Sequence, residues 1–259
     1  MEFLKRVHAK NILKWGGANQ NAVVLSGDLT TSCEIDEFRS AYPERFISLG
    51  LMEQNMMSFA AGLAREGLLP LVHTFSVFMY RRALDQIEMS IAYPNLPVKI
   101  FGFLPGVTTP GGASHQALND IAVMRSLPNM SIIETGDATD VENVLEISKN
   151  INGPVYIRMI RGEIPRLFPK ENPTVFCESR KLSEGNDIAL LTSGICTEES
   201  LNVTNQLREK GITIQHLHIT TLKPFGDSLI EDALTKVKYG IITMAVSYTH
   251  LRAHETTLD

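Results

Sequence analysis

The stretch that decides the fold is Phe46-Ile-Ser-Leu-Gly-Leu-Met-Glu-Gln-Asn-Met-Met57, which holds one carboxylate, Glu53, among apolar residues. Phe46 to Leu49 is typical of a short buried strand, and Gly50 lets the chain turn. From Gln54 to Glu66 the apolar residues recur at helical spacing. Glu53 is therefore predicted at the point where a strand is followed by a helix.

This position allows two readings of Glu53. Ligands approach open α/β sheets at such junctions, and contact with Leu51, Met52 and Met56 would leave the carboxylate poorly solvated. Desolvation raises the pKa of a carboxyl group, which would let Glu53 exchange a proton with a ligand near neutral pH. The alternative is a water-exposed glutamate in the first turn of a helix, where the helix dipole favours a negative charge.

Composition sets the class of protein. The chain has 259 residues, 44% of them hydrophobic, which is enough for two packed domains. A net charge of −5 gives no electrostatic reason to bind nucleic acid or an anionic membrane. The three cysteines are odd in number and far apart, which suggests neither a disulfide framework nor a metal cluster. Without an N-terminal apolar leader or a membrane-length run, the chain is expected to be cytoplasmic.

Strands and helices alternate along the first part of the chain. The pattern predicts an α/β fold, with a mostly parallel sheet flanked by helices and the chemistry in loops at the carboxyl ends of the strands. The expected strands are Ala22–Leu25, Phe46–Leu49, Leu68–Phe75 (broken by Pro70), Val98–Phe103, Met130–Glu134 and Val155–Met159. The expected helices are Gln54–Glu66, Phe78–Ala92, one beginning near Ala117, and Ala138–Asn150.

A boundary is expected in Leu167–Thr174, which holds two prolines. Strands at Asp187–Thr192, Thr213–Leu217 and Ile241–Met244 and a helix at Glu198–Lys210 follow it. They predict a second, smaller α/β domain that is incomplete. The expected organisation is a first domain at 1–166, a linker at 167–181, a partial second domain at 182–245 and a separate tail at 246–259.

The tail lacks apolar periodicity. Its run Val246-Ser-Tyr-Thr-His-Leu-Arg-Ala-His-Glu-Thr256 resembles the translation of a transposase-type sequencing adaptor, so residues 246–259 are interpreted as non-native. His250 and His254 are four residues apart, as metal ligands on a helix can be. The adaptor interpretation is favoured, and the tail is excluded from the fold reasoning.

Four motifs together resemble the pyrimidine-binding domain of the transketolase family. They are Leu49-Gly-Leu-Met-Glu-Gln-Asn55, Thr74-Phe-Ser-Val-Phe78, Arg82-Ala-Leu-Asp-Gln-Ile87 and Ser114-His-Gln116. The similarity spans roughly residues 5 to 165, and Leu182–Ala245, with Thr220-Thr-Leu-Lys-Pro224, resembles the start of the family's C-terminal domain. The resemblance implies a thiamine diphosphate-binding fold.

The resemblance also implies a partner. Full-length members carry a preceding domain whose Gly-Asp-Gly motif and a later Asn hold Mg²⁺ and thiamine diphosphate, and this chain has neither that motif nor that domain. It resembles the C-terminal subunit of a split transketolase, active only with an N-terminal subunit that carries the diphosphate and Mg²⁺ site. A heterotetramer or a dimer of such pairs is expected. The implied reaction is transfer of a two-carbon ketol unit between sugar phosphates or related substrates.

Cofactor residues follow from the matched motifs. Glu53 matches the glutamate that hydrogen-bonds N1′ of the aminopyrimidine and so activates the cofactor, which then acts as an electron sink. Phe75 and Phe78 match positions around the aminopyrimidine, where an aromatic face stacks on a flat ring. The alternative for both phenylalanines is a place in the core.

Substrate residues are implied in the same way. His115 matches a histidine that hydrogen-bonds sugar oxygens and moves protons, as a near-neutral pKa permits; the alternative is a surface histidine. Ser32 matches a phosphate-binding serine, or caps the following helix. Arg161 matches the family's phosphate-binding arginine, whereas Arg158 could pair internally with a carboxylate.

Two positions depart from the family pattern. Gly111 stands where transketolases usually have an aspartate that reads a sugar hydroxyl, and Phe103 stands where they have a second phosphate-binding histidine. Losing these groups should alter sugar recognition. Two other functions therefore stay open: a thiamine diphosphate enzyme of another type, such as a 1-deoxyxylulose-5-phosphate synthase or a 2-oxo acid dehydrogenase β subunit, and an inactive fragment or regulatory module.

Overall fold

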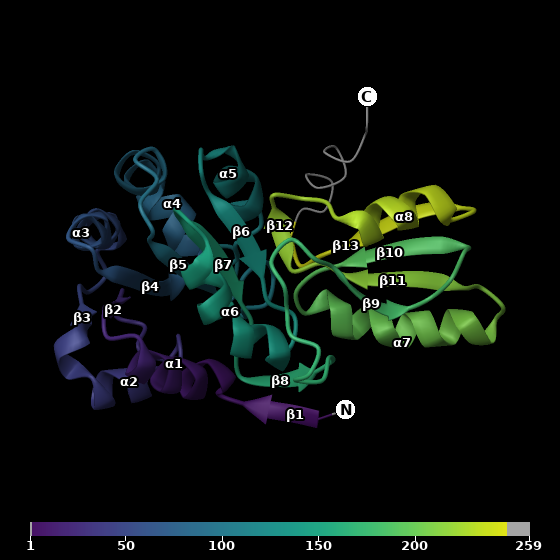
Figure 1. Cartoon of the computed structure of the whole chain (residues 1–259), viewed down its shortest axis with the longest axis horizontal. Coiled ribbons are helices and arrows are strands. Elements are labelled where there is room, and N and C mark those ends of the chain that lie inside the picture. The colour runs from purple at the N-terminus through teal and green to yellow at the C-terminus, as the bar shows by residue number, and fades with distance from the viewer. Residues whose placement is uncertain (1, 248–259) are drawn as a thin grey trace.

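Most of the strands belong to one large and one smaller sheet. The computed structural model describes residues 2–247, and its larger sheet has seven strands in the order β12-β6-β7-β5-β4-β2-β3 (Figure 1). They are β2 (Ala22–Ser26), β3 (Phe46–Ser48), β4 (Leu69–Phe75), β5 (Lys99–Phe103), β6 (Ser131–Glu134), β7 (Val155–Met159) and β12 (Thr221–Lys223). All neighbours are parallel except β12 and β6. The predicted α/β fold with a mostly parallel sheet is confirmed.

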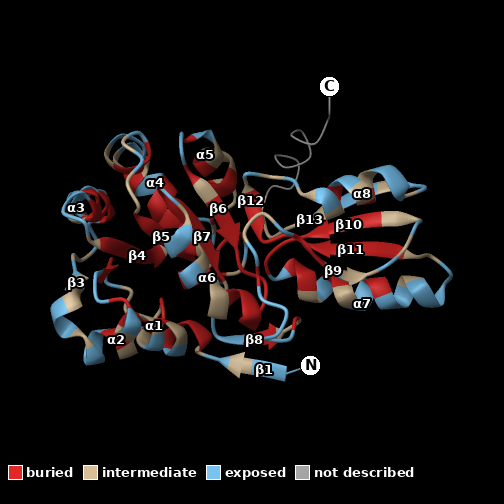
Figure 2. Ribbon diagram, in the orientation of Figure 1, coloured by how far each residue is buried: buried red, intermediate tan, exposed pale blue. Residues whose placement is uncertain are grey.

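Helices cover both faces of the large sheet (Figure 1). One face carries α3 (Glu53–Arg65), α4 (Ser76–Gln86), the π-helix η2 (Ile87–Ala92) and α5 (Asp120–Ser126). The other carries α1 (Val7–Ala18), α2 (Asp36–Ala41) and α6 (Ala138–Asn150), and the short 3₁₀ helix η1 (Pro43–Arg45) precedes β3. Because both faces are covered, β2, β5 and β7 are buried along their whole length (Figure 2).

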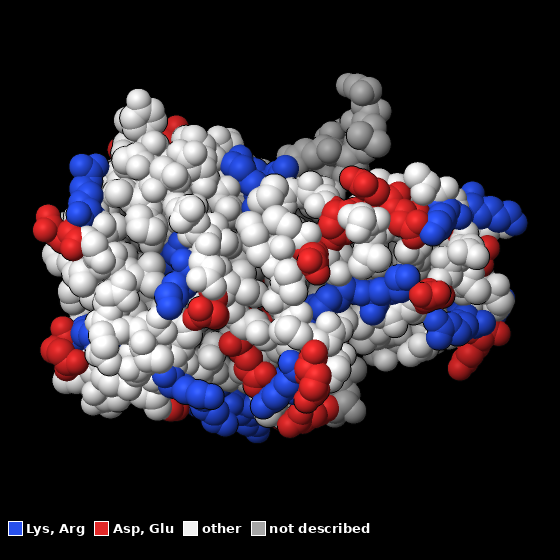
Figure 3. All heavy atoms as spheres, viewed as in Figure 1, with Lys and Arg blue, Asp and Glu red and all other residues white. Residues whose placement is uncertain are grey.

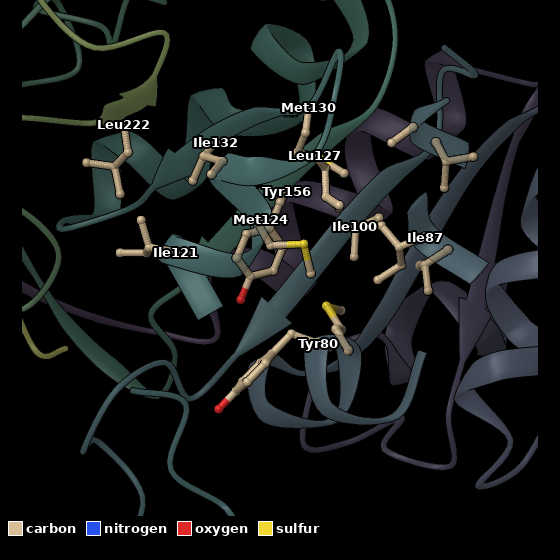
Figure 4. Packing of buried hydrophobic residues seen from close by; sticks show 14 of the residues in the cluster. Tyr80, Ile87, Ile100, Ile121, Met124, Leu127, Met130, Ile132, Tyr156 and Leu222 are labelled. Atoms are coloured by element: carbon tan, nitrogen blue, oxygen red, sulfur yellow. The ribbon is translucent and has the colours of Figure 1, made fainter. Parts of the chain in front are cut away.

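Apolar side chains from strands and helices pack together on the first of these faces. Figure 4 shows Tyr80 of α4, Ile100 of β5, Met124 of α5 and Tyr156 of β7 in one cluster. Leu222 of β12 joins the same cluster from a distant part of the sequence. Fully burying an aliphatic or aromatic side chain of this kind contributes roughly 1.5–3 kcal/mol, so this layer holds the helices that carry the candidate site.

The second unit is smaller. Its four-stranded sheet has the order β13-β10-β11-β9, built from β9 (Arg180–Ser183), β10 (Ile188–Thr192), β11 (Ile214–His218) and β13 (Gly240–Met244) with α7 (Cys196–Glu209) and α8 (Ser228–Lys236). β12 lies between these elements in sequence but pairs with β6 of the large sheet. A further antiparallel pair joins β1 (Glu2–Lys5) to β8 (Glu163–Arg166). Neither β1 nor β8 was predicted.

A buried polar cluster joins the two units. His218 Nε2 of β11 lies 2.8 Å from Asp140 Oδ2 of α6, and Arg180 of β9 hydrogen-bonds the other oxygen of Asp140. The Arg180 guanidinium also lies 3.7 Å from the ring centre of Phe168. Burial raises the pKa of Asp140, but the attraction of His218 and Arg180 lowers that pKa further, to well below its usual range. This carboxylate thus stays ionised and ties the smaller sheet to α6.

One local expectation was wrong, and two differ from the structure in detail. Pro70 does not break its strand: it is the second residue of β4, opposite Val23 of β2, and prolines are tolerated near strand starts. The helix expected near Ala117 begins at Asp120, because Ala117 and Gly106 exchange backbone hydrogen bonds within the preceding loop. The helix expected at Phe78–Ala92 is α4 followed by η2, with a kink at Ala83.

The surface and the tail add little to the site. On the face drawn in Figure 3, basic and acidic side chains are interspersed.

Within residues 2–247, no helix has the length and apolarity needed to cross a membrane. The adaptor-like tail, including His250 and His254, lies outside the described residues apart from Val246 and Ser247.

Candidate active site

Glu53 begins α3, directly after β3 and its turn. Gly50 adopts φ +72° in that turn, a conformation that costs glycine little. The Glu53 side chain is only 2% exposed, so the prediction of a buried carboxylate is confirmed. Of the three apolar residues expected to bury it, only Met56 is itself buried, whereas Leu51 and Met52 are 66% and 54% exposed. Leu51 and Met52 instead line, together with Glu53, a cavity of about 470 Å³.

Arg82 of α4 pairs with this carboxylate. Its Nη1 donates to Glu53 Oε1 at 2.7 Å, and its guanidinium carbon lies 3.9 Å from the ring centre of Phe78. The Arg82 side chain is 45% exposed, in contrast to its partner. We did not predict Arg82 as a site residue from the sequence. The available signal was its spacing from Phe78, because residues four apart share one face of a helix.

Phe75, Phe78 and His115 lie together beside this pair. The rings of Phe75 and Phe78 are 5.7 Å apart and stacked, and His115 meets Phe78 edge-on at 5.4 Å. Phe75 ends β4, Phe78 lies in the first turns of α4, and His115 belongs to the loop between β5 and α5. The structure therefore brings Glu53 and these three predicted residues into one continuous group.

The loop that carries His115 is attached to α4. Arg81 Nη1 donates to the carbonyl of Ala113 at 2.9 Å, and the Ser114 hydroxyl lies 2.9 Å from His115 Nδ1. A Cβ atom on Gly111 would lie 2.8 Å from the Cβ and Cγ of His115. The missing side chain at position 111 thus makes room for the observed position of His115.

Ser32 and Arg161, the two residues expected to bind phosphate, form a second group beside the large sheet. Arg161 Nη1 donates to the backbone carbonyl of Ser32, and the backbone N–H of Gly162 donates to Glu34 Oε1 at 3.0 Å. The exposed Arg161 also lines a cavity of about 370 Å³ with residues of the β5–α5 loop, including Thr108. The two predicted phosphate residues are therefore in direct contact, although through the Ser32 carbonyl and not its hydroxyl.

Arg158 lies in the interior. Its Nε donates to Asp120 Oδ2 at 2.9 Å and its Nη1 donates to Glu134, with all three side chains buried. Burial lowers the pKa of Arg158, but these two carboxylates raise it above its usual value. The internal pairing weighed for Arg158 is the correct one. Phe103 is also buried, with its ring edge-on to His8 at 5.5 Å, and cannot reach a ligand.

No metal centre accompanies these groups within residues 2–247. In that part of the chain, no three His, Cys, Asp or Glu side chains are placed to hold a metal ion. A buried hydroxyl near the site, Thr74 Oγ1, has no hydrogen-bond partner there. It lies beside Gly27, where an added Cβ atom would be 3.4 Å from it.

Comparisons with known proteins identify the family. The model of the transketolase pyrimidine binding domain matches residues 6–166, and that of the transketolase C-terminal domain matches residues 178–248. A putative uncharacterized transketolase family protein of Sinorhizobium fredii is 39% identical over 82% of this chain, which spans 62% of that relative. The 6-deoxy-6-sulfo-D-fructose transketolase subunit SqwH of a Clostridium species is 31% identical, over 88% of this chain and 71% of the relative.

A solved structure agrees with the sequence relatives. A split gene transketolase, described as an inactive β4 tetramer, superimposes with a TM-score of 0.86 and 33% identity, covering 97% of this chain and 85% of its own. The family domain matched at residues 6–166 takes up more than half of the 259 residues. The chain therefore belongs to the transketolase family, with that family's pyrimidine-binding and C-terminal domains.

Proposed function

We propose that this chain is the subunit of a split transketolase that provides the pyrimidine half of a thiamine diphosphate site. The proposal rests chiefly on one arrangement: the buried Glu53 carboxylate and the ring face of Phe78 both contact one flat group, the Arg82 guanidinium. A flat heterocycle with a ring nitrogen needs both features, a carboxylate at its edge and an aromatic surface at its face. The Arg82 guanidinium, which is flat and carries N–H donors, already uses both.

In this proposal the chain's residues bind and orient the cofactor. Glu53 would share a proton with N1′ of the aminopyrimidine in a hydrogen bond, Phe78 would stack on the ring, and Phe75 would support Phe78. The unpartnered Thr74 Oγ1 is a further polar group available beside Gly27. When bound, thiamine diphosphate supplies the electron sink for cleaving and forming the bond to a two-carbon ketol unit.

The substrate is proposed to lie between the group around Glu53, Phe78 and His115 and the group formed by Ser32 and Arg161. His115 hydrogen-bonds a hydroxyl or carbonyl oxygen near the reacting carbon and exchanges its proton. Arg161, held by Ser32, is placed for an anionic end group such as a phosphate or a sulfonate. Gly111 offers no hydrogen-bond acceptor where other transketolases have a carboxylate. The enzyme should therefore be less selective for the sugar hydroxyl that this carboxylate binds.

A partner subunit completes the site. We propose that it carries the diphosphate-binding motif and Mg²⁺, and that it covers the exposed Leu51 and Met52, which line the cavity. Exposed apolar side chains that lie together among polar residues mark protein interaction sites. The relatives named as subunits or as split gene products support this division of labour.

The decisive experiment pairs this chain with the protein encoded beside it. Glu53→Gln should lower kcat for ketol transfer by about 10²–10⁴-fold, the range expected for losing a proton-transfer group, while the pair still binds thiamine diphosphate. Glu66→Gln, at the exposed end of the same helix, is the control and should keep full activity. Undiminished turnover in Glu53→Gln would refute the proposal.

A further inference from the structure

Arg82 lies where the proposed cofactor should bind. Its guanidinium contacts Glu53 Oε1 at 2.7 Å and lies 3.9 Å above the Phe78 ring. In the proposed function, these are the two contacts of the aminopyrimidine: its edge on the Glu53 carboxylate and its face on Phe78. One guanidinium and one pyrimidine cannot occupy that volume together.

The chemistry of the two groups is alike. A guanidinium is planar, delocalised and cationic, with N–H donors in its plane, and it stacks on aromatic faces. An aminopyrimidine is planar, stacks in the same way, and presents a ring nitrogen that can carry a proton toward a carboxylate. A site shaped for one of them therefore accepts the other, and the two compete.

Arg82 is free to leave, whereas its neighbour is not. Within the described residues, the Arg82 guanidinium has one hydrogen-bond partner, Glu53, and its side chain is 45% exposed. The Arg81 guanidinium donates to Tyr80, Ala113 and Gln116. The two adjacent arginines thus have different roles. Arg81 holds the His115 loop in place, whereas Arg82 can move into solvent once a ligand binds Glu53.

We propose that Arg82 is a built-in competitor for the cofactor: its guanidinium holds the aminopyrimidine subsite and moves aside when thiamine diphosphate binds. This inference rests on the proposed roles of Glu53 and Phe78. Its consequence is a lower affinity for the pyrimidine part alone, because the ligand must first break the Glu53–Arg82 contact. A ligand that also gains diphosphate contacts on a partner subunit overcomes this competition more easily, so cofactor loading is coupled to assembly.

The test measures binding and needs no catalysis. Thiamine is titrated by calorimetry into the full chain, into Arg82→Ala and Arg82→Lys, and into Arg65→Ala, which removes an exposed arginine at the far end of α3. We expect Arg82→Ala to bind thiamine at least about tenfold more tightly than the unmodified chain. Arg82→Lys should fall between the two, because it keeps the charge but loses the flat face, and Arg65→Ala should not differ from the unmodified chain.

A chemical complementation sharpens the result. Ethylguanidinium replaces the missing end of the side chain, so adding it to Arg82→Ala should weaken thiamine binding toward the unmodified level. The same compound should leave Arg65→Ala unaffected. Thermal melting of each variant confirms that the compared proteins are folded.

Three outcomes overturn the inference in distinguishable ways. Equal thiamine affinity in the unmodified chain and folded Arg82→Ala, with no effect of ethylguanidinium, would show that Arg82 does not compete, and would leave the proposed function standing. Absence of thiamine binding to every variant, together with full activity of Glu53→Gln in the assembled enzyme, would refute both. Weaker binding in Arg82→Ala would make Arg82 a cofactor-positioning residue instead.

Discussion

Two arginines of the same domain each bind carboxylates, and they differ in what surrounds them. Arg158 is fully buried between Asp120 and Glu134, whereas Arg82 covers one buried carboxylate with a half-exposed guanidinium. An ion pair that is wholly buried has no solvent to replace a lost partner, while one at a surface does. The Arg158 contacts therefore hold the fold, whereas the Glu53–Arg82 contact can open for a ligand.

The largest effect is expected in the core. Arg158→Met should lower the free energy of unfolding by about 3–5 kcal/mol, because it removes the buried guanidinium that the buried Asp120 and Glu134 carboxylates both contact. Urea denaturation measures this, with the exposed Arg39→Met as the matched control. A loss below about 1 kcal/mol would mean that Asp120 and Glu134 reach water or other partners, and the contrast with Arg82 would disappear.

Acid should also weaken the core. Burial, with a smaller effect of His218, lowers the pKa of His216 from 6.5 to about 4. Between these pH values the unfolded chain binds a proton at His216 that the folded chain does not. The contribution of neutral His216 to the free energy of unfolding is therefore complete above about pH 6.5 and is lost as the pH falls toward 4. The slope for this one group is at most about 1.4 kcal/mol per pH unit.

His216→Gln tests that assignment. Free energies of unfolding measured in urea at several pH values between 4.5 and 7 should fall less steeply with acid in this variant than in the unmodified chain. Parallel slopes would contradict the assignment and would place the acid sensitivity elsewhere, for instance on His73, whose pKa burial lowers to about 3.

The smallest effect is expected at the site. Arg82→Ala should change the free energy of unfolding by less than about 1 kcal/mol, because water can reach Glu53 once the guanidinium is gone. The same denaturation series measures it beside Arg158→Met. A loss as large as that of Arg158→Met would show that the Glu53–Arg82 contact holds the fold, and would remove the distinction between the two regions.

The sequence predicted the positions of site residues better than their partners. Glu53 could be placed because a strand, Gly50 and a helical period follow one another within a few residues, and such local patterns predict secondary structure directly. The contact of Glu53 with Arg82 joins two helices, and that of Arg161 with Ser32 joins residues 129 apart. Neither leaves a periodic signal, so only the folded chain reveals them.

The fold shows the same division. The parallel strands could be predicted because each is a compact apolar run, and the exact bounds of α6 and β7 agree with the expected ranges. The pairing of β1 with β8 and of β12 with β6 spans long stretches of chain. These short strands have little hydrophobic pattern of their own and are defined by their partners.

The pairing of β12 with β6 has a consequence for any shortened form of the protein. β12 is the outermost strand of the large sheet, although its residues follow most of the second unit in sequence. Removing residues 178–247 would strip this strand and leave the backbone of β6 open to pairing with another molecule. Leu222 would leave the hydrophobic cluster at the same time. The pyrimidine-binding domain expressed alone is thus predicted to aggregate, and its second unit serves it as a protective border.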